Sequence, residues 1–279
     1  MIIWVASYPK SGNTWVRALL TSYYYTDDGH YDPKQLIQIP DYPNPKIVGK
    51  KFIADNTVHL HWDKSQKNLC KDNKVIFLKT HNALLRIGNY PFTTSEYTKG
   101  VIYIVRDPRN VVTSLKNHMD FNTYEDAFNF MKNENIILTN KEKVFSRNQY
   151  LSSWKMNYTS WCKMNDYKKI IIKYEDMLKY PNETFEKLVT FTNLLSNHEN
   201  KIDEKKLERA ILSTNFENMK KTEKSGQFRE NVFSPLTANK REFFYLGPKN
   251  DWKTILDKNF VDKMNDYYLE DLKVLGYES

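Results

Sequence analysis

Four short runs of apolar, β-branched residues alternate with helical patterns along this chain, and this alternation limits the available folds most strongly. The runs are Ile2–Ala6, Val75–Leu78, Val101–Val105 and Ile170–Lys173. Short runs of this type, bounded by polar residues, are typical of strands buried on both faces. The helical patterns lie at Thr14–Tyr24, Pro108–Met119, Tyr124–Asn133, Glu183–Thr192, Asp203–Leu212 and Lys258–Leu275. We predict a three-layer α/β fold whose mostly parallel central sheet carries helices on both faces.

Length and composition favour one domain. The chain has 279 residues, of which 40% are apolar and 14% aromatic, enough for a substantial core. Internal repeats and low-complexity linkers are absent from the sequence, so we expect a single domain over residues 1–279. Trp154 and Trp161, seven residues apart, have the spacing of core residues on one helical face. His59 and His61 alternate as on a strand, and we expect them to be structural or exposed.

The net charge and the cysteine content limit which ligands the protein can bind and in which cellular compartment we expect it. The net charge is +8, but the lysines are scattered and form no arginine-rich stripe, so we expect a small anionic ligand and no nucleic acid. Cys70 and Cys162 form neither a disulfide framework nor a metal-ligand pattern. Because the given sequence starts with a strand pattern, we expect no cleaved leader, and no apolar run approaches the roughly 20 residues of a membrane span. We expect a cytoplasmic protein without a bound metal.

A strand, a tight loop and a helix start follow one another in the first 20 residues. Ile2–Ala6 leads into Ser7-Tyr8-Pro9-Lys10-Ser11-Gly12-Asn13-Thr14-Trp15, and a helical pattern follows. Loop N–H groups and the first helical turn favour an anion at one point. A Walker loop would place its lysine after a second glycine, whereas Lys10 precedes Gly12 and the first glycine is missing. We therefore predict a phosphate site that differs from an ordinary ATP-hydrolysing one.

Two further strand ends carry candidate site residues. Val101–Val105 is followed by Arg106, and Ser114 lies eight residues later in a helix that begins near Pro108. An arginine and a hydroxyl together suit a phosphate monoester. Lys79-Thr80-His81 follows another strand, and a histidine there is a natural general base. Ligands of open α/β sheets bind at this carboxyl edge.

Taken in order, these segments resemble the soluble, cytosolic-type sulfotransferases. The loop from Tyr8 to Trp15 is similar to that family's 5′-phosphosulfate loop, with Asn13 where threonine is usual. Arg106 to Ser114 resembles the 3′-phosphate segment, and Lys79-Thr80-His81 the segment of the catalytic histidine. Two later stretches resemble segments around the adenine: Lys173-Tyr174-Glu175-Asp176-Met177 and Thr214-Asn215-Phe216-Glu217-Asn218-Met219. These matches keep the family's order from residue 2 to residue 253.

The resemblance implies transfer of a sulfuryl group from 3′-phosphoadenosine 5′-phosphosulfate to a hydroxyl or amine, without a metal. His81 would take the acceptor proton, and Lys10 would stabilise the leaving phosphate. The implied catalytic set is Lys10, Lys79, His81 and Ser114. The implied donor-binding set is Lys10, Ser11, Gly12, Asn13, Thr14, Trp15, Arg106, Ser114, Tyr174, Thr214, Phe216 and Gly247.

One late segment departs from the family pattern. The family's Arg-Lys-Gly, whose charged residues grip the 3′-phosphate, corresponds here to Tyr245-Leu246-Gly247. Loss of a charged clamp would cost about 1.5–3 kcal/mol of donor affinity. Arg241, Lys249 and Arg229 are the candidate replacements.

Two other functions fit parts of the sequence: a P-loop nucleotide kinase, and a non-catalytic nucleotide-binding protein on the same scaffold. The resemblance also implies that loops shape the acceptor site, and here these would be Asp27–Trp62, Asn82–Lys99, Phe121–Gln149 and Thr222–Phe244. Their aromatic residues, Phe52 and Phe233 among them, suit a phenol or a sterol-like or lipid-like alcohol. Their lysines suit an acidic sugar. The sequence allows a monomer or a homodimer.

Overall fold

The computed structural model describes most of the chain. The described residues are 1–49, 57–72, 74–138, 148–196, 201–228, 230 and 240–277, with the backbone of 232–233; residue 240 is also described by its backbone alone. Phe52, Arg229 and the side chain of Phe233, which the sequence singled out, lie outside this part.

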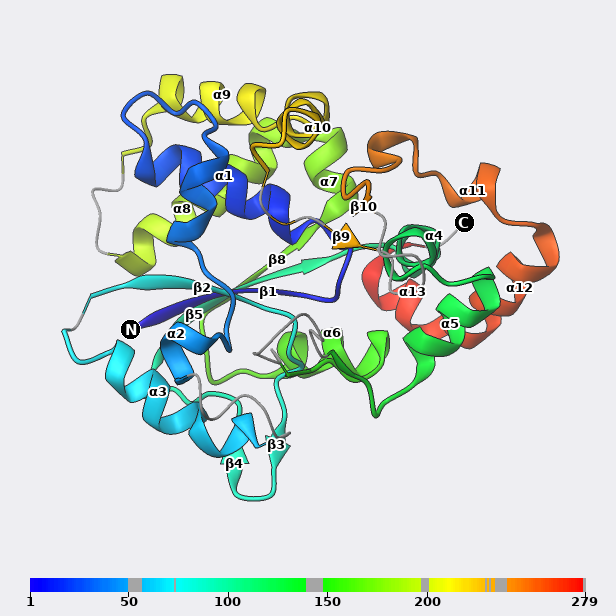
Figure 1. The fold of residues 1–279 in the computed structure, drawn as a ribbon, viewed down its shortest axis with the longest axis horizontal. Helices are drawn as coiled ribbons and strands as arrows, with labels where there is room; N and C mark the ends of the chain where they lie inside the picture. The colour runs from blue at the N-terminus through cyan, green and yellow to red at the C-terminus, as the bar shows by residue number, and fades with distance from the viewer. Residues whose placement is uncertain are drawn as a thin grey trace.

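A four-stranded parallel sheet forms the centre of the molecule (Figure 1). Its strand order is β2 (Ile76–Thr80), β1 (Ile2–Ser7), β5 (Thr98–Val105) and β8 (Lys169–Lys173). All three strand pairs are parallel, and Trp4 lies between Leu78 on one neighbour and Val101 on the other. The predicted sheet is therefore confirmed, with β2 running two residues further toward Thr80 than expected.

The helices and minor strands complete the architecture. The helices are α1 (Asn13–Tyr25), α2 (Pro45–Val48), α3 (Trp62–Leu69), α4 (Pro108–Met119), α5 (Tyr124–Lys132), α6 (Trp154–Lys163), α7 (Tyr174–Lys179), α8 (Pro181–Ser196), α9 (Glu204–Ser213), α10 (Phe216–Lys224), α11 (Trp252–Ile255), α12 (Lys258–Tyr267) and α13 (Leu269–Leu275). Three antiparallel pairs join β3 (Arg86–Ile87) to β4 (Tyr90–Pro91), β6 (Ile137–Leu138) to β7 (Gln149–Tyr150), and β9 (Val232–Phe233) to β10 (Lys240–Arg241).

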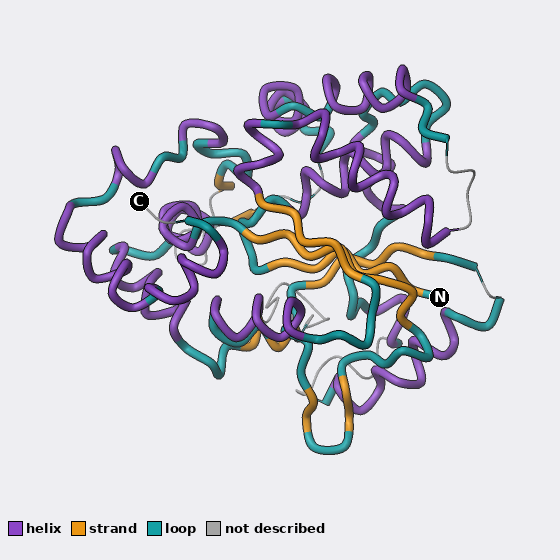
Figure 2. Tube along the Cα trace, turned by 180° about the vertical axis from the view of Figure 1, so that it is seen from behind, coloured by secondary structure: helices purple, strands orange, loops and turns teal. Residues whose placement is uncertain are grey.

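Both faces of the sheet are buried, as the apolar strands require. Side chains of a strand alternate between faces. Ile2 and Trp4 belong to one core cluster, whereas Ile3 and Val5 belong to a second cluster that includes Leu19 of α1. Figure 2 shows the strands as a layer between helices on either side. This arrangement confirms the predicted three-layer α/β fold.

The structure confirms the prediction for the two tryptophans and contradicts the one for the two histidines. Trp154 and Trp161 are each 1% exposed and lie on α6, so their core role is confirmed. His59 and His61 lie in a 3₁₀ helix, Val58–His61, and the strand alternation predicted for them is wrong. His59 binds the Tyr150 hydroxyl through Nδ1 at 2.9 Å, a tertiary contact that the two-residue spacing does not reveal.

The helix predicted over Lys258–Leu275 is two helices. Tyr268 ends α12 with φ −103° and ψ 16°, and α13 begins at Leu269. The Tyr268 ring is buried against Trp154 at 4.9 Å between ring centres, so packing favours a break that the apolar periodicity does not show. The helices α3, α7 and α10 were not predicted from the sequence.

The parallel topology brings three predicted segments to one edge of the sheet. β1, β2 and β5 end at Ser7, Thr80 and Val105, and Ala6 lies in register with both Thr80 and Tyr103. The loop of Lys10, His81 and Arg106 follow these three ends. α10 and β10 lie beside the same edge in Figure 1.

Candidate functional site

The loop between β1 and α1 adopts a conformation that few residue types accept. Gly12 caps α1 with φ 102°, and a Cβ there would lie 2.6 Å from the Tyr174 ring. Lys10 also has a positive φ of 65°, which costs a non-glycine residue free energy. Arg106 stabilises this turn by donating from Nη1 to the Lys10 carbonyl at 2.9 Å. The loop conformation is therefore held by these contacts, and it leads the backbone into the first turn of α1.

Asn13 and Ser11 have different roles in this loop. The Asn13 amide donates back to the Val5 carbonyl at 3.0 Å and to Ser7 Oγ at 3.1 Å, so it ties the loop to the end of β1. Ser11 Oγ is buried and has no hydrogen-bond partner among the described residues. The first N–H groups of a helix also lack partners within the helix. Ser11 and the start of α1 are thus suited to an anion, while the Asn13 side chain serves the loop itself.

Lys10 projects its ammonium group into this site. Nζ donates to the Phe243 carbonyl at 3.2 Å and lies 4.1 Å from the centre of the Phe243 ring. Burial, and next the Arg106 guanidinium, lower the pKa of Lys10 to about 7, whereas Glu223 and Glu230 act in the opposite direction. An ammonium has three N–H donors, so contact with Phe243 leaves donors for a ligand.

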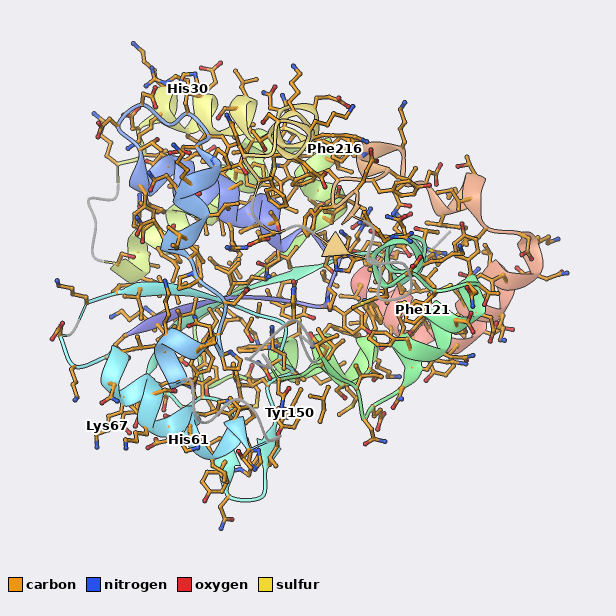
Figure 3. All side chains as sticks on the ribbon, in the orientation of Figure 1. His30, His61, Lys67, Phe121, Tyr150 and Phe216 are labelled. Carbon is orange, nitrogen blue, oxygen red and sulfur yellow. The ribbon has the colours of Figure 1, made fainter. Side chains whose placement is uncertain are left out.

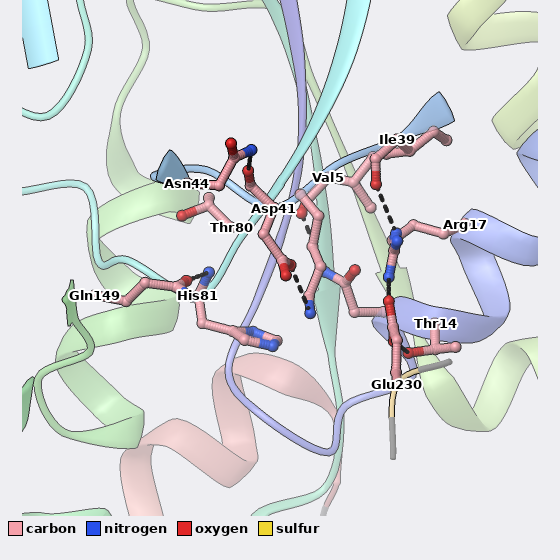
Figure 4. Close-up of polar contacts among 12 residues, drawn as sticks. Val5, Thr14, Arg17, Ile39, Asp41, Asn44, Thr80, His81, Gln149 and Glu230 are labelled. Atoms are coloured by element: carbon pink, nitrogen blue, oxygen red, sulfur yellow. Dashed lines mark hydrogen bonds and ion pairs between the residues drawn. The ribbon is translucent and has the colours of Figure 1, made fainter. Parts of the chain in front are cut away.

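His81 follows β2 and is held in one orientation. Its Nδ1 lies 2.7 Å from the Ser7 carbonyl, which can only accept, so Nδ1 carries the proton and Nε2 has a free lone pair. Its backbone N–H donates to Gln149 Oε1 at 2.6 Å, as Figure 4 shows. Burial, and next Lys79, lower the pKa of His81 to about 3. The ring is therefore neutral near pH 7, with its Nε2 lone pair unprotonated.

Lys79 lies beside His81 and is paired with a carboxylate. Its Nζ is 2.9 Å from Asp41 Oδ1, and both side chains are largely buried. The segment that carries Asp41 runs along the edge of β2, where Lys79 N–H donates to the Pro40 carbonyl at 2.9 Å. Asp41 was not identified from the sequence because it lies in an irregular segment far from the recognised motifs.

Thr14, Arg17 and Glu230 form a polar cluster at the start of α1 (Figure 4). Thr14 Oγ1 donates to Glu230 Oε2 at 3.2 Å, and the Arg17 guanidinium is ion-paired with Glu230 Oε1. Burial opposes the charge on Glu230, but Arg17 and then Lys79 keep its pKa below the usual range. The carboxylate is thus held by two side chains of the first turns of α1. In the sequence, Arg17 lies one turn after Asn13 in the same helical pattern. That spacing is the signal that could have predicted this polar cluster.

Arg106 lies behind the loop and contacts Tyr174. Its guanidinium carbon is 4.0 Å from the centre of the Tyr174 ring, and its Nε is buried without a partner among the described residues. Ser114 lies on α4, which begins after the Asp107 cap, and is partly buried. Arg106 thus both supports the loop and keeps a donor for a ligand.

The residues expected around an adenine are only partly brought together. Trp15 lies 5.9 Å from Tyr174, edge to face. Phe216, the first residue of α10 and labelled above the sheet in Figure 3, lies against Gly247, where a Cβ would come within 2.2 Å of its ring. The Thr214 hydroxyl is buried and donates to the Ala210 carbonyl at 2.7 Å, so it stabilises the end of α9.

A basic pocket lies where the family pattern departs. Its volume is about 470 Å³, and its lining residues are Phe216, Glu217, Lys220, Lys221, Lys224, Tyr245, Leu246, Pro248 and Lys249. Of the three candidate replacements for the missing clamp, Lys249 lines this pocket. Arg241 is instead ion-paired with Asp120 and donates to Asn117 at 3.0 Å. Arg229 lies outside the described residues.

The part of the chain that the structure describes offers neither a metal site nor a membrane span. It contains no group of three or more His, Cys, Asp or Glu side chains placed to hold a metal ion. None of its helices is long and apolar enough to cross a membrane.

Comparisons with known proteins find a matching family and several relatives. The family model described as "Sulfotransferase domain" matches residues 2–276. Rabbit (Oryctolagus cuniculus) amine sulfotransferase is 22% identical over 296 residues, covering 96% of this chain and 82% of the relative. Dog (Canis lupus familiaris) sulfotransferase 1B1 is 23% identical over 269 residues, with the same coverage.

Two solved structures share the fold. Mouse sulfotransferase SULT7A1 complexed with PAP has a TM-score of 0.61 at 19% identity and covers 98% of this chain and 84% of that one. Retinol dehydratase in a complex with retinol and PAP has a TM-score of 0.58 at 18% identity, covering 98% and 81%.

Proposed function

Because the chain belongs to the sulfotransferase domain family, we propose that it moves a sulfuryl group from 3′-phosphoadenosine 5′-phosphosulfate to a hydroxyl or amine of a small-molecule, lipid-like or sugar acceptor. One observation carries this proposal most strongly: Lys10 and His81 lie at the same edge of the sheet, and Ser7 and Phe243 orient them. PAP, the donor without its sulfuryl group, is named in both solved structures reported above.

His81 would act as the general base. Its Nδ1 proton is held by the Ser7 carbonyl, so Nε2 is available to take the acceptor's proton as the oxygen or nitrogen attacks sulfur. A neutral imidazole is required for this step, and the ring is neutral over the physiological range. A pKa near 3 makes it a weak base, and the negative charge of a bound donor would raise that pKa toward the range of an effective base. Gln149 holds the backbone of His81, and Ser7 holds its ring.

Lys10 would stabilise the leaving phosphate. As the sulfur–oxygen bond breaks, negative charge develops on the bridging oxygen, and a nearby ammonium group lowers the energy of that state. Lys79 would help to neutralise the sulfuryl oxygens, while Asp41 keeps its side chain in place. The transfer needs positioning and charge stabilisation, which this set of side chains supplies.

The donor would be bound at its two phosphate ends. Ser11, Thr14 and the start of α1 would hold the 5′-phosphate, and Arg106 with Ser114 would contact the 3′-phosphate. For the missing family clamp we propose Lys249 and Lys220, because both line the pocket beside Phe216 and Tyr245. Ligand binding there would compete with the contacts of Lys220 to Glu242 and the Tyr245 carbonyl, each at 3.2 Å.

The compartment and the assembly complete the proposal. Cys70 and Cys162 are both free thiols, which agrees with a reducing compartment, so we place the reaction in the cytoplasm. The active unit would be a monomer or a homodimer.

A binding experiment separates this function from the two alternatives. We expect PAP to raise the melting temperature, since a ligand that binds only the folded state stabilises it. ATP–Mg²⁺ should have a smaller effect at equal concentration. Stabilisation by ATP–Mg²⁺ alone would favour a kinase. PAP binding without sulfation of any acceptor in a panel of phenols, alcohols, amines and sugars would favour a non-catalytic binding protein.

A further inference from the structure

A buried carboxylate beside the site has no part in the chemistry described above. Glu223 lies on α10 and is 5% exposed. Burying a charged group is costly unless hydrogen bonds satisfy it. Glu223 Oε1 accepts from the Phe243 N–H at 2.6 Å, and Oε2 accepts from the Phe244 N–H at 2.9 Å. Both oxygens are thus used to hold two consecutive residues of the backbone.

The backbone that Glu223 holds is the one that contacts Lys10. The Phe243 carbonyl accepts a hydrogen bond from Lys10 Nζ, and the Phe243 ring lies under the same ammonium group. Contacts therefore run continuously from Glu223 through Phe243 to Lys10. The two end residues are far apart in sequence, and no recognised motif links them.

Lys10 needs such a support because its side chain is long. Arg106 fixes the backbone of Lys10 by donating to the Lys10 carbonyl. The four-carbon stem of the lysine nevertheless rotates freely about its bonds. An unsupported ammonium would sample many positions, and ordering it would cost conformational entropy. The carbonyl and ring of Phe243 restrict the ammonium to one region, provided that the segment of Phe243 is itself fixed.

We propose that Glu223 is the positioning residue for Lys10: by fixing the backbone at Phe243 and Phe244, it holds the lysine ammonium where the donor's bridging oxygen would lie. This inference rests on the proposed function, because it assigns Glu223 to the same donor site. In this proposal Glu223 contacts neither donor nor acceptor; it acts on Lys10 through the backbone at Phe243 and through its own charge.

Glu223 also supports Lys10 through its negative charge, which raises the pKa of the Lys10 ammonium and so favours its cationic form. Removing its negative charge should lower the pKa of Lys10 below about 7 and leave less of the cationic form. His118 on α4 also faces this region, because its ring lies 5.9 Å from Phe243. The charged and titratable groups that face Lys10 are Arg106, Lys79, Glu223, Glu230 and His118.

The test uses three variants of the full chain. Glu223→Gln keeps the size of the side chain and removes its charge. Glu223→Asp keeps the charge but is one methylene shorter, so it cannot reach both N–H groups. Glu208→Gln, an exposed glutamate on α9, is the charge-matched control. Two quantities are measured: PAP affinity by calorimetry, and the pKa of Lys10 from the pH dependence of its acetylation, followed by peptide mass spectrometry.

We expect Glu223→Gln to lower the Lys10 pKa and to weaken PAP binding about tenfold, as for loss of a charged hydrogen bond. Glu223→Asp should weaken PAP binding while leaving the Lys10 pKa near its parental value. Glu208→Gln should match the parent in both measurements. If Glu223→Gln does not fold, the Asp variant still provides the test.

Parental PAP affinity in either Glu223 variant would overturn the proposal, as would a parental Lys10 pKa in the Gln variant. A fall in melting temperature with both measurements unchanged would make Glu223 a purely structural residue. If the unmodified protein binds no PAP, the proposed function fails instead. The Lys10 titration then still reports separately whether Glu223 supports Lys10.

Discussion

At the scale of single residues, backbone carbonyls decide what Lys10 and His81 can do. The Ser7 carbonyl selects the tautomer of His81 that leaves Nε2 free. The Phe243 carbonyl holds the ammonium of Lys10. Both residues were predicted from the sequence, but neither of these partners was. A carbonyl leaves no side-chain signature, so only the folded backbone shows it.

Removing either side chain should reduce turnover. We expect Lys10→Ala and His81→Ala each to lower the rate of sulfuryl transfer by about 10²–10⁴. The measurement is donor-dependent sulfation by purified variants, with folding checked by circular dichroism. A nearly normal rate for His81→Ala would exclude it as the base.

The pH dependence should follow Lys10. Its pKa of about 7 means that the cationic form is lost as the pH rises, so kcat/KM for the donor should fall above about pH 7. Lys10→Arg retains its charge at every accessible pH. The alkaline fall should therefore disappear in that variant, although its absolute rate will be lower. An unchanged alkaline fall in Lys10→Arg would assign the titration to another group.

At the scale of elements, the turn after β10 is the part that departs from the family and was least predictable. Gly247 was expected at the donor site, and the structure gives it a local reason: a positive φ of 55° and close contact with the Phe216 ring. The lysines beside this turn come from α10, a helix that was not predicted. Their convergence depends on how α10 packs against residues 245–249.

A glycine pair tests this turn. Gly247→Ala should lower stability by about 1–3 kcal/mol, because it adds a clash with Phe216 to an unfavourable backbone angle. Gly226→Ala is the control, since Gly226 has φ 76° but a Cβ added there would have nothing within 4 Å. PAP affinity should fall only in Gly247→Ala. Equal PAP affinities in the two variants would remove the turn from the donor site.

The lysine pocket makes a separate prediction about the donor's second phosphate. Lys249→Ala and Lys220→Ala should each weaken PAP binding by roughly threefold to tenfold. AMP, which lacks the 3′-phosphate, should bind the variants and the parent equally well. Calorimetric titration with both nucleotides distinguishes the outcomes, and an equal loss for AMP would argue that the lysines do not recognise this phosphate.

At the scale of the whole molecule, the buried site should make stability depend on pH. The pKa of His81 lies near 3 in the folded protein, below its value of 6.5 without burial, and the pKa of His118 is lowered as well, mainly by burial. The unfolded chain therefore binds more protons at acid pH. The stabilisation is present above about pH 6.5 and is lost as the pH falls toward 3.

Melting temperatures between about pH 8 and pH 4 test this dependence. We expect a progressive decrease below about pH 6.5 that is smaller in a His81→Gln, His118→Gln double variant. Carboxylates such as Glu230 add to the loss at lower pH, because its lowered pKa stabilises the folded state only while it is ionised. An identical pH dependence in parent and double variant would show that these histidines do not contribute.

Local patterns in the sequence were sufficient to predict the sheet and the helices α1, α4, α5, α8 and α9. The anion site at the sheet edge, which they also indicated, stays a prediction. The strands are short apolar runs, and the loop from Tyr8 to Trp15 keeps its anion-binding residues adjacent, so neighbouring residues carry the signal. The contacts that these residues make with distant parts of the chain are visible only in the folded structure. Glu223, Asp41, Glu230 and the Phe243 carbonyl reach the site through long-range packing, which spacing along the chain does not encode. The break at Tyr268 and the helical turn at His59 have the same origin, because tertiary ring contacts there override the local periodicity.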